Sequence, residues 1–191
     1  KNHQIDTAKK IILFPARITS WKGQLEFINV LKKMNTQNIL VLFAGDTKNE
    51  SYTKLVRDKI KQNNLEVVCK ILGSVDQDEM RSLYQLTDLS VSFPLQAEGF
   101  GRTITESLYS KTPVLAFDYG GVKNQLVNLS DMFKVKPQDY QALPAKIEKL
   151  LSLSEVEKKE ALEGVQSVIE SNFSKINMVK QYLKLYESFK S

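Results

Sequence analysis

The chain has 191 residues, a length that corresponds to one domain or a little more, and 42% of them are hydrophobic, which is ample for a packed core. Its formal net charge is +5, and the basic residues are mostly lysines spread over predicted helix faces, which argues against a nucleic-acid-binding protein. No apolar run reaches the roughly 18 residues of a membrane span, and the polar N-terminal segment lacks a signal-peptide core, so we expect a soluble, cytoplasmic protein.

The first predicted strand and helix are separated by a basic loop. Residues 1–9 are interpreted as a linker, and the lone His3 within it is assigned no function. Residues 10–16 form an apolar run of strand length, and residues 23–34 have the apolar spacing of a helix. Between them, Arg17 and Lys22 either hold a diphosphate or are simply exposed loop cations, and their spacing alone does not decide.

Two further units of strand and helix follow. Residues 38–46 are predicted to form a buried strand that ends in a turn, residues 52–60 a helix, and residues 67–72 a second strand. The single cysteine, Cys69, lies in that second strand, where core packing is expected instead of catalysis.

A D-x-D pair comes next, at Asp76 and Asp78. Such pairs can hold Mn²⁺ or Mg²⁺ on a diphosphate. However, Glu79 lies three residues after Asp76 and directly before a helical pattern, which is the signature of a helix start. We therefore predict a capping box here and no metal site.

The stretch from Ser92 to Glu106 organises the rest of the chain. An apolar strand pattern ends here, tightens through Gly99-Phe100-Gly101 and enters a helical pattern. A strand, a glycine turn and a helix start form the place where α/β sheets bind ligands. Because glycine lets the backbone approach a ligand and the helix N-terminus favours an anion, a diphosphate is expected at Gly99 to Thr103.

Two carboxylates bracket this anion site. Glu98 precedes the helix, and Glu106 lies roughly 7 Å along its axis at 1.5 Å per residue. A carboxylate beside phosphates is repelled unless it faces hydroxyl groups, so each glutamate is expected to accept hydrogen bonds from sugar hydroxyls. The ligand implied is a sugar, a diphosphate and a ribose. Arg102, inside the helix start, either adds a cation near the phosphates or faces solvent.

The remaining elements complete the alternation of strands and helices. Residues 113–117 are predicted to form a strand, and Gly120-Gly121 follow it as a turn. Helical patterns cover residues 140–151, 155–171 and 176–189. The last of these carries more apolar surface than one domain needs, so we expect part of it to stay uncovered.

Several of these motifs resemble one family. Glu98 and Glu106 are the ends of an E-x7-E motif, and EGFGRTITES followed by KTPVLAFDYGG is similar to the C-terminal, nucleotide-sugar-binding domain of the retaining glycosyltransferases of family 4. The resemblance runs from about Ile11 to the C-terminus. It implies the GT-B fold, of which this chain would be one half: a three-layer, Rossmann-like, doubly wound α/β domain with a parallel sheet of about six strands and C-terminal helices.

The resemblance also implies a domain plan and partners. Residues 1–9 would be a linker from an N-terminal acceptor-binding domain, residues 10–172 the nucleotide-sugar-binding domain, and residues 173–191 a helix that packs on that N-terminal domain. The protein would transfer a sugar from a nucleoside diphosphate donor, such as a UDP-sugar, to an acceptor hydroxyl in cell-envelope polysaccharide or lipopolysaccharide biosynthesis. A lipid-linked or saccharide acceptor would bring it to the inner face of the membrane, which the positive charge suits.

The family pattern assigns roles to individual residues. R-x4-K-G after the first strand is its phosphate-binding pair, so Arg17, Lys22 and Glu98 would be catalytic, without metal or other cofactor. Main-chain groups of Gly73 to Val75 would read the base, and Gly120 and Gly121 would meet the donor. The donor-binding set is Gly73, Ser74, Val75, Gly99, Phe100, Gly101, Arg102, Thr103, Glu106, Gly120 and Gly121.

The sequence departs from the family pattern at a few positions and leaves other functions open. Ala16 stands where the family usually has glycine, and Asn124 stands where it often has glutamate, so a role that needs a charge there is in doubt. A sugar-nucleotide epimerase of the same fold and a catalytically silent sugar-nucleotide-binding module are the alternatives. A receiver domain would need clustered aspartates after the first strand, where this loop is basic.

Overall fold

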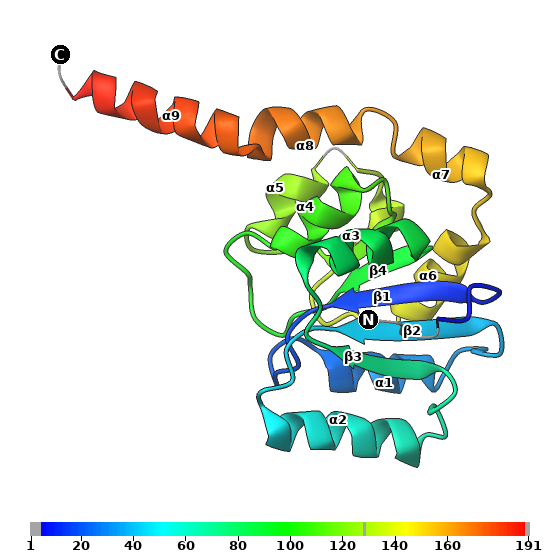
Figure 1. Ribbon diagram of the computed structural model, residues 1–191. Coiled ribbons are helices and arrows are strands. Elements are labelled where there is room, and N and C mark those ends of the chain that lie inside the picture. Colours follow the sequence, from blue (N-terminus) through cyan, green and yellow to red (C-terminus); the bar gives the residue numbers. More distant parts are fainter. Residues whose placement is uncertain (1–4, 128, 190–191) are drawn as a thin grey trace.

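A computed structural model describes residues 5–127 and 129–189, so His3 lies outside the described residues (Figure 1). Its centre is a six-stranded parallel sheet with the order β3-β2-β1-β4-β5-β6, which is the doubly wound arrangement of Rossmann-like domains. The predicted fold class is therefore confirmed. The strands are β1 (Lys10–Pro15), β2 (Ile39–Ala44), β3 (Cys69–Gly73), β4 (Leu89–Ser92), β5 (Val114–Phe117) and β6 (Lys134–Val135).

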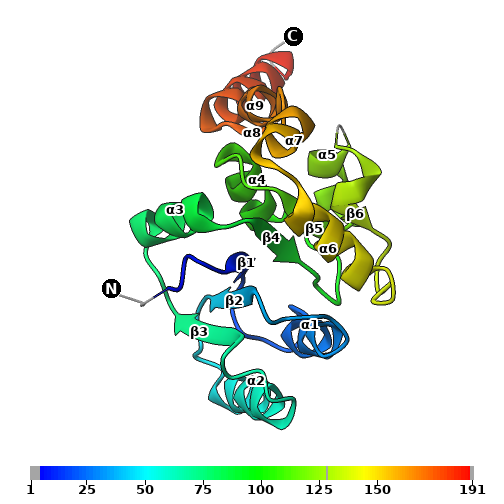
Figure 2. The same cartoon turned by 90° about the vertical axis from the view of Figure 1, so that its right-hand side faces the viewer.

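Helices cover both faces of the sheet. Figure 2 shows α1, α2 and α6 on one side and α3 and α4 on the other. The helices are α1 (Gln24–Leu31), α2 (Glu50–Gln62), α3 (Gln77–Leu86), α4 (Arg102–Tyr109), α5 (Val122–Leu126), α6 (Leu143–Ser152), α7 (Glu155–Ala161), α8 (Val165–Phe173) and α9 (Lys175–Ser188), with a 3-10 turn at Asp131–Phe133.

Strand β1 shows why the sheet is buried on both faces. Its side chains alternate, so Ile12 and Phe14 join the larger core with α1, whereas Ile11 and Leu13 join the smaller core with α3. Such strands read as continuous apolar runs in the sequence. Near the carboxyl ends of β1 and β4 the larger core contains aromatic rings, and the ring centroids of Phe14 and Phe93 lie 6.5 Å apart.

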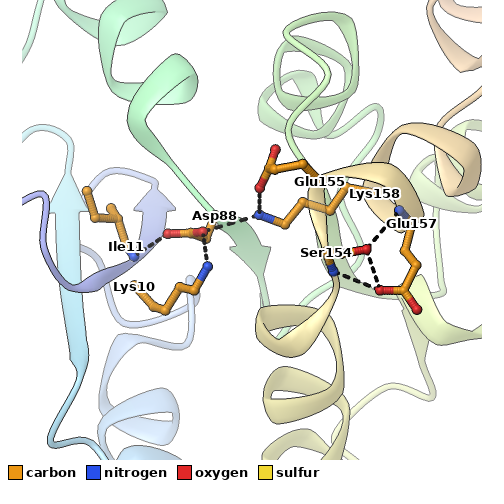
Figure 3. Close-up of polar contacts among 7 residues, drawn as sticks. All are labelled: Lys10, Ile11, Asp88, Ser154, Glu155, Glu157 and Lys158. Atoms are coloured by element: carbon orange, nitrogen blue, oxygen red, sulfur yellow. Dashed lines mark hydrogen bonds and ion pairs between the residues drawn. The ribbon is translucent and has the colours of Figure 1, made fainter.

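The amino ends of the central strands are joined by a charged cluster (Figure 3). The carboxylate of Asp88 accepts hydrogen bonds from the Ile11 amide at 2.9 Å, from Lys10 Nζ at 3.0 Å and from Lys158 Nζ at 3.2 Å. Lys158 also donates to Glu155 at 2.8 Å. This cluster attaches α7 to β1 and β4 at the edge of the sheet opposite the carboxyl ends of the strands.

Two local features predicted from the sequence, a helix capping box and a buried cysteine, are present in the structure. The amide of Glu79 donates to Asp76 Oδ1 at 2.8 Å and the amide of Asp76 donates to Glu79 Oε2 at 3.2 Å, so the predicted capping box is present. Cys69 is buried, and burial raises the pKa of its thiol to about 12. The residue packs in the core, as expected.

The helix predicted over residues 155–171 was wrong in one respect. The structure divides it into α7 and α8, with Gly164 between them at φ +72°. A left-handed residue cannot continue an α-helix, and glycine adopts this conformation without steric cost. The chain can therefore turn there, and α8 packs against α4.

Helix α9 extends away from the sheet (Figure 1). Its apolar side chains are exposed, as expected from the sequence, with Ile176 at 69% and Leu183 at 56%. Among the described residues, no helix combines the length and the hydrophobicity needed to cross a lipid bilayer.

Candidate functional site

The candidate site lies where the chain reverses its direction of winding. Strands β1 and β4 are parallel neighbours, with Ile12 paired to Leu89 and Leu13 to Ser90. The loop after β1 leads to α1 on one face of the sheet, and the loop after β4 leads to α4 on the other. Loops that diverge in this way leave a crevice at the carboxyl ends of the strands.

The two loops are held against each other by backbone contacts. The Leu95 amide donates to the Trp21 carbonyl at 2.7 Å. Gly23 has φ +85°, and a Cβ at this position would lie 2.1 Å from the Phe93 carbonyl oxygen. Because no other residue fits so close to that carbonyl, Gly23 fixes the position of the basic loop relative to the carboxylate loop.

The two predicted cations both line the crevice, but Lys22 is ion-paired and largely buried, whereas Arg17 is exposed. Lys22 forms an ion pair with Glu98, and their side chains are only 16% and 11% exposed. The Lys22 ammonium also lies 4.2 Å from the centroid of the Trp21 ring. Arg17 is exposed, and its carbonyl accepts a hydrogen bond of 2.8 Å from the fully buried Gln24.

Helix α4 begins at the same crevice. Gly101 precedes it at φ +75°, and a Cβ there would lie 2.7 Å from Val122 Cγ2. No side chain caps α4, so the amides of its first turn stay available to an anion. The Phe100 carbonyl accepts a hydrogen bond from Gln125, and the Phe100 ring packs 5.3 Å from that of Phe173 at the end of α8.

The glycine pair after β5 supports the loop from behind. The Gly121 amide donates to the Glu98 carbonyl at 2.9 Å. A Cβ on Gly121 would lie 1.9 Å from the Gly99 carbonyl oxygen, and Gly120 has φ +63°. The hydroxyl of Tyr119, whose pKa is raised by burial and then by Glu98, donates to the Pro94 carbonyl at 2.6 Å.

The second carboxylate is held by two neighbours. Glu106 Oε2 accepts a hydrogen bond of 3.2 Å from the hydroxyl of Tyr84, which lies on α3. Glu106 Oε1 pairs with Arg102 Nε at 3.1 Å, where the Arg102 side chain is 84% exposed. Arg102 thus faces solvent and also lines the crevice, and its proximity to a phosphate stays a prediction.

These groups surround one cavity of about 780 Å³. This is large enough for a nucleotide-sized ligand. The predicted residues that line it are Arg17, Lys22, Val75, Glu98, Phe100, Gly101, Arg102, Thr103 and Glu106. Residues of α3, among them Met80 and Tyr84, close its far side.

Comparison with known sequences decides the family. The family of glycosyl transferases group 1 matches residues 1–163, which is more than half of the chain. The chain belongs to that family. A trehalose synthase of Thermococcus litoralis is 27% identical over 195 residues, which covers 97% of this chain and 46% of that protein.

Solved structures agree with a group 1 glycosyl transferase domain. A glycosyltransferase from Rickettsia africae is 30% identical with a TM-score of 0.89. The match covers 98% of this chain and 49% of the Rickettsia chain. HepE of Anabaena, solved in complex with UDP and glucose, is 22% identical with a TM-score of 0.85, which is a likeness of fold, and 51% of it is covered. The neighbours have the GT-B fold, and this chain spans about half the length of its relatives.

Five of the residues predicted to bind the donor lie outside the cavity lining of this glycosyl transferase domain. Gly73, Ser74, Gly99, Gly120 and Gly121 are not among the residues that line the cavity. Gly73 ends β3 at φ +75°, and its carbonyl accepts the Gly45 amide at 2.9 Å. Contact of these five residues with a donor stays a prediction.

Sequence reasoning missed the residues that hold the charged groups. Tyr84 lies in the helical pattern that follows Glu79, and Gln24 lies in the helix predicted over residues 23–34. The buried Gln24 in an otherwise apolar helix face was a signal, because a fully buried amide needs hydrogen-bond partners. Nothing in the spacing of Tyr84 distinguished it from a core residue.

Proposed function

We propose that the full-length protein is a retaining family 4 glycosyltransferase and that this chain is its donor-binding half. It would transfer a sugar from a nucleoside diphosphate sugar to an acceptor hydroxyl. The observation that supports this most is that one cavity brings together Arg17, Lys22, the uncapped start of α4 and the two glutamates. HepE, of the same fold, was solved with UDP-glucose, which makes a UDP-sugar the first donor to test.

The charges suit a diphosphate leaving group. When the bond between the anomeric carbon and the phosphate oxygen breaks, negative charge develops on the diphosphate. Arg17, Lys22 and the first amides of α4 would stabilise that charge, and this arrangement requires no metal ion. Preorganised groups of this kind contribute roughly 100-fold or more each to the rate.

The proposed transfer step needs no nucleophile from the protein. The acceptor oxygen forms a bond to the anomeric carbon on the face that the diphosphate leaves, and the acceptor proton passes to the departing phosphate oxygen. Glu98 would accept a hydrogen bond from a hydroxyl of the donor sugar, and Glu106 would accept hydrogen bonds from the ribose. We therefore assign Glu98 an orienting role in catalysis.

The acceptor side would come from an N-terminal domain. The exposed apolar half of α9 is available to pack on it, and the chain spans only about half of its relatives. Alone, this chain would bind donor weakly and transfer nothing. Cell-envelope polysaccharide or lipopolysaccharide synthesis, on the cytoplasmic side of the membrane, is the setting we propose for the whole enzyme.

Transfer by the full-length protein tests the proposal. UDP-, GDP- and ADP-sugars would be screened for hydrolysis and transfer, and the active donor used with Lys22→Ala. We expect the turnover of Lys22→Ala to fall about 100-fold. Lys33→Ala, which removes an exposed lysine just after α1, should leave turnover unchanged. Equal turnover in both variants would refute the assignment of the site.

A further inference from the structure

Tyr84 is a buried residue of α3 for which the reaction scheme above has no use. The residue is only 2% exposed, yet it lines the cavity, and its hydroxyl lies 3.2 Å from Glu106 Oε2 and 3.2 Å from the Thr103 carbonyl. It thus reaches from one helix to the first turns of another. A buried tyrosine hydroxyl usually finds a hydrogen-bond partner, and here that partner is a carboxylate that lines the cavity.

The backbone beneath Tyr84 is fixed from the same side. Its carbonyl accepts a hydrogen bond of 2.8 Å from Thr112 Oγ1, and the Thr112 carbonyl accepts one of 3.2 Å from Ser107 Oγ. Tyr84, Thr112 and Ser107 are all buried. Ser107 follows Glu106 on α4. Tyr84 is therefore linked to α4 at two points: its backbone through Thr112 to Ser107, and its hydroxyl directly to Glu106.

The hydroxyl of Tyr84 stays protonated and therefore donates. Burial raises its pKa far above the ordinary tyrosine value, and the nearby charge of Glu106 raises it further. A phenol that shares its proton between a carboxylate and a carbonyl favours the carboxylate, because hydrogen bonds to charged acceptors are stronger. Tyr84 therefore acts on Glu106 as a fixed donor.

Arg102, the other partner of Glu106, is a weaker restraint. It pairs with Oε1 across one turn of α4, and with its side chain 84% exposed the pair competes with water. Among the residues that the structure describes, each oxygen of Glu106 thus has one protein donor and retains acceptor capacity for another group. Two free acceptor positions side by side suit two adjacent hydroxyl groups.

We propose that Tyr84 is a positioning residue that orients Glu106 toward the vicinal 2′- and 3′-hydroxyls of the donor ribose. The inference rests on the proposed function, because it assumes a ribonucleotide in this cavity. It adds that discrimination between ribose and deoxyribose depends on a buried hydroxyl from α3, which does not itself touch the sugar.

The experiment compares nucleotides on the full-length protein. Calorimetry would measure the affinity of UDP, GDP and ADP, and then of the 2′-deoxy and 3′-deoxy counterparts of the tightest one. Tyr84→Phe, which removes only the hydroxyl, should weaken the ribonucleotide about fivefold to tenfold and the deoxy forms less. The preference for ribose over deoxyribose should shrink accordingly.

Two further variants separate positioning from general stability. On a Glu106→Gln background, Tyr84→Phe should cause little further loss of affinity, because both act through one carboxylate. Tyr52→Phe is the matched control: Tyr52 is 7% exposed, and its hydroxyl has no hydrogen-bond partner among the described residues. It should leave the nucleotide preference unchanged.

Failure of the proposed function and failure of the role of Tyr84 would give different results. If the wild-type protein binds none of the three nucleotides, the proposed function is wrong and this inference falls with it. If the wild type binds and Glu106→Gln weakens binding, but Tyr84→Phe keeps the full preference for ribose, the inference alone is overturned. Full additivity of the two substitutions would overturn it as well.

Discussion

Lys22 and Glu98 neutralise each other at the cavity. Both side chains are largely buried, so the pair is better shielded from solvent than the surface pairs of this chain. Under the proposed function, a nucleoside diphosphate that binds Lys22 would first have to separate it from Glu98, whereas a complete donor would supply a sugar hydroxyl to Glu98 in exchange. The ion pair would therefore favour a sugar-bearing donor over the product nucleotide.

Replacing Glu98 by Gln should separate these two effects. With Lys22 freed, the affinity for the nucleoside diphosphate alone should rise about fivefold, which corresponds to about 1 kcal/mol for the lost ion pair. Transfer from the complete donor should fall, because the amide holds the sugar hydroxyl less strongly. Calorimetry with the nucleotide and a turnover assay measure the two quantities.

Glu155→Gln provides the comparison, since it also removes a lysine partner, Lys158, but at the opposite edge of the sheet. It should leave nucleotide affinity unchanged. An unchanged or weaker nucleotide affinity in Glu98→Gln would mean that the ion pair does not compete with the ligand.

At the scale of elements, Asp88 is the point where β1, β4 and α7 are joined. Burial by itself raises the pKa of Asp88, but the hydrogen bonds from the Ile11 amide, Lys10 and Lys158 outweigh it, so the pKa lies below its ordinary value. The ionised carboxylate therefore stabilises the fold above the ordinary carboxyl pKa of about 4. That contribution is lost as the pH falls through the lower pKa of the folded state.

Asp88→Asn should accordingly lower the free energy of unfolding by about 2 kcal/mol at pH 7. The difference from the wild type should shrink as the pH falls below about 4, because the wild-type carboxylate becomes protonated. Urea denaturation at a series of pH values measures this.

Asp58→Asn is the control for Asp88→Asn, because Asp58 pairs with Lys54 at 4.0 Å on an exposed face of α2. Its effect should be close to zero. A pH-independent difference for Asp88→Asn would show that the loss comes from packing and not from charge.

At the scale of the whole molecule, α9 has the pattern of a helix with a missing partner. At 100° per residue, Ile176, Val179, Leu183 and Tyr186 form one stripe, and Met178, Tyr182, Leu185 and Phe189 form the adjacent one. All eight side chains are exposed. An apolar half-cylinder of this length is typical of an interface.

If α9 packs on the proposed N-terminal domain, Leu183→Asp in the full-length protein should disturb that contact. A charge buried there without a partner is costly, so transfer should fall at least tenfold while nucleotide affinity stays within about twofold. Gln181→Asp, on the polar side of the same helix, should change neither. Unchanged transfer in Leu183→Asp would place this face outside any interface that the enzyme needs.

Much of the fold was predictable because it depends on local patterns. Apolar runs identified strands β1 to β5, the spacing of Asp76 and Glu79 identified a helix start, and Gly99 and Gly101 marked the turn between β4 and α4. The split at Gly164 was not predicted, because the helical pattern continues across it and only packing of α8 against α4 reveals the turn.

The sequence by itself determined which residue types reach the carboxyl ends of the strands: two cations in the first loop, and a glycine turn between two glutamates in the central one. Only the tertiary structure decided how they pair. Lys22 meets Glu98, 76 residues away, and Tyr84 meets Glu106, because the strand order sets β1 beside β4 and packs α3 close to α4. Spacing along a chain carries no record of such contacts, since they depend on which elements become neighbours in the sheet.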